Sequence, residues 1–301
     1  MIVVPVPARA SVWDLADWVE LRAVVAGDGS ASRGDLESAV RGSPAFGRDS
    51  TNDRDAFIAA VFSEITDREA QAGLGYPFVL SGSQLQTKPT AWRTASAYLI
   101  CLCLSWFGES RATKVDASPA RLFEALSTEA AASFIGGSAV RFGSPRKELP
   151  SSFRRAVDEL CQTHLGGEGV GFSSRETLHW TKDGGLDVVA WRDPGDNRTG
   201  RVIMFGACAS GSNWPTKLGQ LNADVWLTRF VERRPVGLPL KAFFVPFRLE
   251  GEPRWTSLSW EAGILFDRCR IARWAPRLKS SVHGNGVAWA RAIMAQELRT
   301  I

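Results

Sequence analysis

The chain has 301 residues, of which 45% are hydrophobic and 23% are charged, a composition that is ordinary for globular proteins and excludes a largely disordered one. It contains three histidines and five cysteines without paired C-x-x-C spacing, which excludes a recognisable zinc site. The longest apolar run, residues 98–107, is too short to cross a bilayer, and residues 1–11 lack the basic leader of a secretory signal. We therefore expect a soluble cytoplasmic protein with no membrane partner.

The first half of the chain is dominated by apolar residues at helical spacing. Ser11 is the expected N-cap of the first helix. The pattern predicts helices over residues 11–25, 35–40, 52–72, 90–107 and 118–134, with one short strand over residues 76–80. No catalytic constellation is visible here, so we expect a mostly helical domain, residues 1–149, that binds a partner or positions a substrate. The glycine-rich and proline-rich segment 136–150 is the expected boundary.

The second half changes to alternating helices and strands. The pattern predicts, in order, a helix over residues 153–164, strands over 170–180, 186–191 and 201–208, a helix over 216–232 and a strand over 242–247. Asp187 stands near the start of the second of these strands, directly after a glycine pair. A carboxylate on a rigid strand is a suitable ligand for a divalent cation, because Mg²⁺ prefers hard oxygen donors.

The segment K-D-G-G-L-D-V-V, followed by a turn and a strand that leads to G-A-C-A, resembles the Mrr-like branch of the PD-(D/E)xK restriction-endonuclease-like superfamily. The resemblance implies an α+β protein in which residues 150–301 form an αβββαβ core. It also implies that Asp187 binds the metal. Ala207 and Ala209 stand where the family places Gln and Lys, and Lys217, at the start of the next helix, is in a position to replace that lysine.

The remaining site residues each have two interpretations. Glu168 or Asp183 is expected to supply a second acid for Mg²⁺, although Glu168 also fits an ordinary surface glutamate and Asp183 also fits a turn-forming residue. Asn213 and Trp214 are candidates for substrate contact. In the expected strand or sheet edge of residues 263–273, the alternating arginines Arg268 and Arg270 suit either DNA phosphates or ion pairs between domains.

Two functions follow from this interpretation. The first is a magnesium-dependent DNA endonuclease of a bacterial restriction or antiviral defence system, with Asp187 and a second acid at the metal and Lys217 stabilising the transition state. The alternative is an inactive nuclease-fold subunit that binds nucleic acid or a protein partner in a defence complex, because Ala207 and Ala209 cannot serve catalysis. A chance motif in an ordinary α/β protein is the third possibility. Residues 1–150 contain 15 Lys and Arg against 17 Asp and Glu, and residues 151–301 contain 21 against 15, a basic excess that fits DNA or simply a solvated surface.

Overall fold

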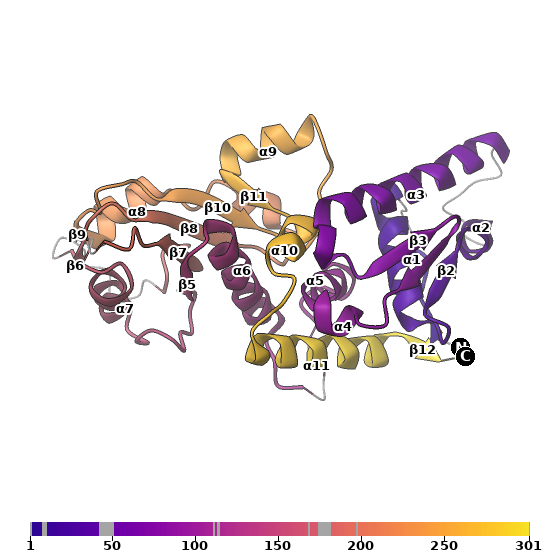
Figure 1. Cartoon of the computed structure of the whole chain (residues 1–301), viewed down its shortest axis with the longest axis horizontal. Helices are drawn as coiled ribbons and strands as arrows, with labels where there is room; N and C mark the ends of the chain where they lie inside the picture. Colours follow the sequence, from indigo (N-terminus) through magenta and orange to yellow (C-terminus); the bar gives the residue numbers. More distant parts are fainter. Residues whose placement is uncertain are drawn as a thin grey trace. The chain divides into compact units, whose positions relative to one another are not determined.

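The computed structural model describes residues 2–7, 11–41, 51–110, 112, 115–167, 169–173, 182–196 and 198–300. The fold is α+β, and the chain divides into two compact units (Figure 1). Unit 1 consists of Met1–Pro119 and Arg268–Ile301, and unit 2 consists of Ala120–Asp267. No helix of the described residues is long and apolar enough to cross a membrane.

This division differs from the predicted boundary between residues 149 and 150 at two places. The helix and strand that precede that boundary belong to unit 2, because the strand pairs with the sheet of that unit. The last segment of the chain, from Arg268 onward, returns to unit 1, where Arg268 forms buried ion pairs. Both differences come from long-range contacts that a local pattern does not contain.

Unit 1 is mostly helical, as predicted. Its helices are α1 Val12–Val25, α2 Arg33–Arg41, α3 Thr51–Ala72, α4 Ala91–Thr94, α5 Ser96–Phe107, α10 Arg268–Trp274 and α11 Ser280–Glu297, with the 3-10 turn η1 Gly73–Gly75. Its strands are β1 Ile2–Val3 paired with β12 Arg299–Thr300, and a sheet of β2 Ser30–Ser32, β4 Gln84–Thr87 and β3 Phe78–Ser81. The predicted Ser11 cap is confirmed: Ser11 Oγ accepts from the Asp14 N–H at 3.2 Å, and the Asp14 carboxylate accepts from the Ser11 N–H at 3.0 Å.

A buried network of charges holds the helices of unit 1 together. Arg68 from α3 donates to Asp17 at 2.6 Å and to Glu20 at 3.0 Å, both on α1, and Arg268 from α10 donates to Asp17 at 2.7 Å. Tyr98 donates to Glu20 at 2.8 Å. Because both arginines are fully buried and face acids, the network compensates charges that would otherwise be costly to remove from water.

Unit 2 is built on a five-stranded mixed sheet with the order β11-β10-β8-β7-β5. Its strands are β5 Ser138–Arg141, β7 Val188–Arg192, β8 Val202–Cys208, β10 Leu240–Phe244 and β11 Ile264–Phe266. Strands β5, β7 and β8 pair antiparallel, whereas β8, β10 and β11 pair parallel. The other elements of unit 2 are α6 Pro119–Ile135, α7 Phe153–Glu159, the π turn η2 Leu160–His164, β6 Val170–Phe172, the 3-10 turn η3 Trp214–Lys217, α8 Ala223–Phe230, β9 Val231–Arg233 and α9 Arg254–Ala262.

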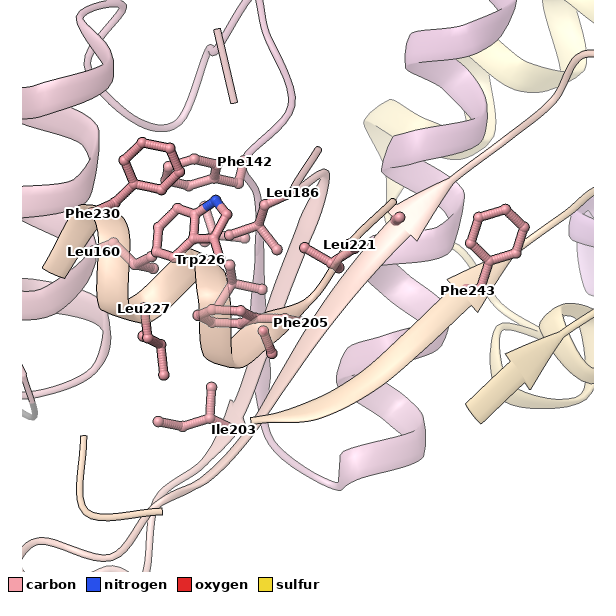
Figure 2. Close-up of a cluster of buried hydrophobic side chains, with 14 of the residues drawn as sticks. Phe142, Leu160, Leu186, Ile203, Phe205, Leu221, Trp226, Leu227, Phe230 and Phe243 are labelled. Carbon is pink, nitrogen blue, oxygen red and sulfur yellow. The ribbon is translucent and has the colours of Figure 1, made fainter. Parts of the chain in front are cut away.

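Helices cover both faces of this sheet. Phe243 of β10 belongs to the hydrophobic cluster around Trp226 of α8, which Figure 2 shows with the rings of Phe142 and Phe230 close by. The next residue points to the opposite face, since side chains alternate along a strand. There Phe244 stacks on Phe266 at 4.5 Å between ring centroids, and Phe266 meets a phenylalanine of α6. We call these the α8 face and the α6 face of the sheet.

Several predicted elements of unit 2 differ in detail. The predicted strand over residues 170–180 begins with β6, which pairs with β9 in a separate two-stranded sheet, and residues 174–181 lie outside the described part. The predicted helix over 216–232 is divided among η3, α8 and the start of β9. Helix α8 begins after Asn222, which caps it by accepting from the Val225 N–H at 3.1 Å. The expected strand over 263–273 is the short β11 followed by helix α10.

Candidate functional site

Asp187 lies at the junction of three strands, immediately before β7. Its N–H donates to the Gly206 carbonyl of β8 at 2.9 Å, and its carbonyl accepts from the N–H groups of Phe142 and Gly143, which follow β5, at 2.7 and 3.1 Å. The carboxylate is fixed as well, since Asp187 Oδ2 accepts from the Cys208 N–H at 2.8 Å. The side chain of Asp187 is therefore oriented by the two neighbouring strands.

The glycines of the D-G-G-L-D motif bring the chain to this position. Gly184 has a φ of 66°, and a Cβ on it would lie 2.8 Å from Nε1 of Trp226, so a side chain there would collide with the core. The same indole donates to the Asp183 carbonyl at 3.1 Å. The turn is thus packed against α8, and the strand that follows starts at a fixed place.

Glu124 of α6 converges on Asp187. A Cβ built on Gly143 would lie 2.7 Å from Glu124 Oε2 and 3.1 Å from Asp187 Oδ1. The two carboxylates therefore border one small space that only a glycine leaves open. We call Glu124 and Asp187 the acid pair.

The acid pair lies in a strongly perturbed electrostatic environment. Burial raises the pKa of Asp187 to about 8, with a further increase from the charge of Glu124, although some of its surface remains accessible. Burial also raises the pKa of Glu124, against the lowering effect of Arg141 of β5, whose guanidinium donates to Glu124 Oε2 at 2.7 Å. Without an added cation, Asp187 thus retains its proton at neutral pH, and a perturbed pKa of this kind is typical of functional carboxylates.

The predicted partners of Asp187 differ in where they lie relative to its carboxylate. Asp183 forms the turn, as one of its interpretations held, because its carboxylate accepts from the Gly185 N–H at 3.0 Å; its charge nevertheless raises the pKa of both members of the acid pair. Lys217 lies in η3 rather than in a longer helix, and its charge lowers the pKa of Asp187. Within the described residues the Lys217 ammonium has no carboxylate ion pair. Glu168 lies outside the described residues.

The four candidates for substrate contact differ in their burial and in the groups that they contact. Asn213 is exposed before η3, and Trp214 packs partly against the hydrophobic cluster of unit 2. Arg268 is wrong as a phosphate ligand, because it is fully buried and donates to Asp17 in unit 1. Arg270 lies on α10 and is partly buried.

The face of β8 that meets the acid pair carries Gly206 and Cys208. Ala207 and Ala209, which stand where the family places Gln and Lys, belong to the hydrophobic cluster on the α8 face and point away from the site. Cys208 lies on the α6 face, where the nearby Asp187 and Glu124 charges, after burial itself, raise the pKa of its thiol well above the ordinary value. β8 therefore offers no lysine to the acid pair, and a cation must come from elsewhere.

A magnesium ion is compatible with this donor set. In the described part of the chain, no group of three or more His, Cys, Asp or Glu side chains is arranged to hold a metal. Mg²⁺ does not require such a group, because one or two carboxylates together with waters and substrate phosphates usually complete its six oxygen ligands. The space beside Gly143, bordered by one oxygen of each carboxylate, fits that requirement.

No family model, curated protein or solved structure matches this chain. The site must therefore be interpreted from its own geometry.

Sequence reasoning missed Glu124 and Arg141. The predicted first domain includes Glu124. A carboxylate inside the apolar helix α6, which directly precedes strand β5, is a usable signal for a site residue. Arg141 ends β5, a strand that the boundary prediction treated as linker, and it is 8% exposed. Neither residue is close to Asp187 in sequence.

The basic excess of residues 151–301 does not lie in unit 2. Residues 151–267 contain 14 Lys and Arg and 14 Asp and Glu, whereas residues 268–301 contain 7 against 1. The basic excess of the second half therefore comes from its last segment, which belongs to unit 1. Unit 2, residues 120–267, contains 18 Lys and Arg and 17 Asp and Glu, so its net charge does not by itself favour a polyanionic partner.

Proposed function

We propose that unit 2 is a PD-(D/E)xK-like nuclease domain that hydrolyses phosphodiester bonds of DNA, with Mg²⁺ held by Glu124 and Asp187. The observation that carries the proposal is the convergence of the two carboxylates on the space beside Gly143, where burial raises both pKa values and the charge of Glu124 raises that of Asp187 further. The element order supports it: α6, β5, β7, β8, α8 and β10 occur in the order αβββαβ, with α7, η2, β6, η3 and β9 inserted between them, and Asp187 stands directly before β7.

The protein groups at the site have separable roles in this proposal. A bound metal ion would stabilise charge on the phosphate and lower the pKa of a water ligand. The Cys208 N–H holds one oxygen of Asp187, which leaves the other oxygen, Oδ1, toward the Gly143 space. Lys217, whose ammonium has no carboxylate partner within the described residues, is the side chain that we assign to the developing negative charge of the phosphate.

A second function is favoured by β8. Because its site-facing positions are Gly206 and Cys208, an inactive nuclease fold that binds nucleic acid or a protein partner of a defence complex remains the alternative proposal. The two proposals share the fold and differ in whether the acid pair acts on a bound phosphate.

Cleavage assays on the full chain separate them. Supercoiled plasmid is incubated with the protein and Mg²⁺ or Mn²⁺, next to Asp187→Asn, Glu124→Gln and Lys217→Met. Asp193→Asn is the matched control, because Asp193 is exposed just past the far end of β7 and pairs with Arg201 there. We expect nicking by the wild type and the control, and a loss of about 100-fold or more in the three site variants.

Two results would reject hydrolysis: no cleavage by the wild type with either metal, or equal cleavage by the wild type and Asp187→Asn. In the first case, DNA binding is measured over a range of salt concentrations. Retained binding that weakens steeply with salt supports the inactive nucleic-acid-binding subunit, since phosphate contacts release counterions.

A further inference from the structure

Arg141 occupies an unusual place beside the acid pair. It is the last residue of β5 and is 8% exposed, so water contributes little to the solvation of its charge. Its Nη1 donates to Glu124 Oε2 at 2.7 Å and to the Gly143 carbonyl at 3.0 Å, and its Nη2 donates to the Pro145 carbonyl. One guanidinium thereby connects a carboxylate of α6 to the loop that follows β5.

The same loop is bound to Asp187. The N–H groups of Phe142 and Gly143 donate to the Asp187 carbonyl, so the backbone that carries the second acid is attached to the segment that Arg141 braces. A planar guanidinium with several fixed donors can define such a geometry, whereas a lysine ammonium acts as a single point charge. Arg141 thus binds Glu124 directly and braces the loop that is bonded to Asp187, and Gly143 leaves the space between the two carboxylates open.

We propose that Arg141 is a positioning residue that holds the Glu124 carboxylate beside Asp187, so that both can contact one divalent cation. This inference rests on the proposed function. We assign Arg141 no contact with the phosphate, because it is 8% exposed and three of its five N–H donors already bind Glu124 and two backbone carbonyls. Groups that orient metal ligands in this way commonly affect metal affinity by 10- to 100-fold.

Arg146 provides a matched control. It is equally buried at 8% exposure, follows in the same loop, and donates to the carbonyls of Ser151 and Lys182, but it has no ion pair with either member of the acid pair. It stacks over the Phe142 ring at 4.6 Å, so its removal perturbs the same part of the fold. A purely structural role for Arg141 predicts the same behaviour for both arginines.

Mn²⁺ binding to the full chain is measured by electron paramagnetic resonance for the wild type, Arg141→Met, Arg141→Lys and Arg146→Met. We expect Arg141→Met to weaken Mn²⁺ binding by about 10-fold or more, Arg141→Lys to recover part of it, and Arg146→Met to bind as the wild type does. Equal affinity in Arg141→Met and Arg146→Met overturns the inference.

A metal-free double-mutant cycle separates failure of the inference from failure of the proposed function. Thermal unfolding is compared for Arg141→Met in the wild-type and Glu124→Gln backgrounds. If Arg141 holds the Glu124 charge, its removal lowers the melting temperature less when residue 124 is neutral. Lack of Mn²⁺ binding by the wild type together with this coupling rejects the metal site but retains the contact, and additive effects in the cycle reject the positioning role itself.

Discussion

Replacing Asp187 by asparagine should stabilise the metal-free protein. The side chain titrates near pH 8 in the fold and near its ordinary value of 3.8 in the unfolded chain. At pH 7 this difference corresponds to about 4 kcal/mol of lost unfolding free energy, at 1.36 kcal/mol for each unit between 3.8 and 7. Because the side chain keeps some accessible surface and the fold can relax, we expect a gain of about 2–4 kcal/mol in the Asp187→Asn variant.

The sign of the pH dependence follows from the order of the two pKa values of Asp187. As the pH rises, the unfolded chain releases this proton first, so the contribution of Asp187 to wild-type stability falls between about pH 4 and pH 8. Asparagine does not titrate. The difference between variant and wild type should therefore vanish near pH 4, grow up to pH 8 and then remain constant.

The assay is thermal unfolding in the presence of a chelator, from pH 4 to pH 9. At pH 7 the expected gain raises the melting temperature by about 5–10 °C. Asp193→Asn is the control: hydrogen bonds from the Gly195 N–H and from Arg201 lower the pKa of Asp193, so its removal should give no such rise. If Asp187→Asn and the wild type melt together across this range, the carboxylate is not under electrostatic strain and the basis of the proposed site is lost.

The other predictions concern packing and buried charge. Gly143→Ala should cost roughly 1–3 kcal/mol in urea unfolding and weaken Mn²⁺ binding, because the new Cβ would lie 2.7 Å from Glu124 Oε2; unchanged Mn²⁺ affinity would contradict the geometry of the acid pair. Arg268→Met should lower the unfolding free energy of unit 1 by about 3–5 kcal/mol, since Asp17 keeps fewer partners in a buried place, and a loss below 1 kcal/mol would contradict this. Trp226→Ala should cost about 3–5 kcal/mol by urea unfolding, because the indole is 3% exposed, and a near-neutral result would show that the cluster repacks.

Sequence patterns predicted the elements that are stabilised by contacts between residues close together in the chain. Helix α1 begins at Ser11 because the capping box satisfies its first N–H groups, and that box is visible in four residues of sequence. The hairpin of β7 and β8 follows from two apolar runs joined by a turn. Asp187 was found for the same reason, since both its strand and its glycine turn are contiguous in the chain.

The elements that sequence patterns did not predict depend on pairing between strands that are distant in the chain. Strands β2 and β4 are short and mostly polar, so no clear apolar pattern marks them. They are strands because β2 pairs with β4 and β4 also pairs with β3. β5 lies far from β7 in the sequence, and their pairing places Arg141 opposite Val188, next to Asp187. Glu124 reaches the same place from α6, where it accepts from Arg141. The pairing of β8 with its neighbours also decides which of its side chains face the acid pair. A shift of one residue in the pairing register of β8 would exchange Cys208 for Ala207 at the site.

Two buried carboxylates in this protein, Asp17 and Asp187, lie in opposite electrostatic environments. Burial alone would raise the pKa of Asp17, but Arg268 and Arg68 outweigh it and the pKa is lowered, so that acid is charged and fully compensated inside unit 1. Asp187 has no ion pair in the part of the chain that the structure describes, and its pKa is raised. A fold that needs a buried acid only for stability can pair it with arginine, as unit 1 does. The missing compensation at Asp187, with Glu124 beside it, therefore favours a cation supplied from outside the chain as the group that this site is built to receive.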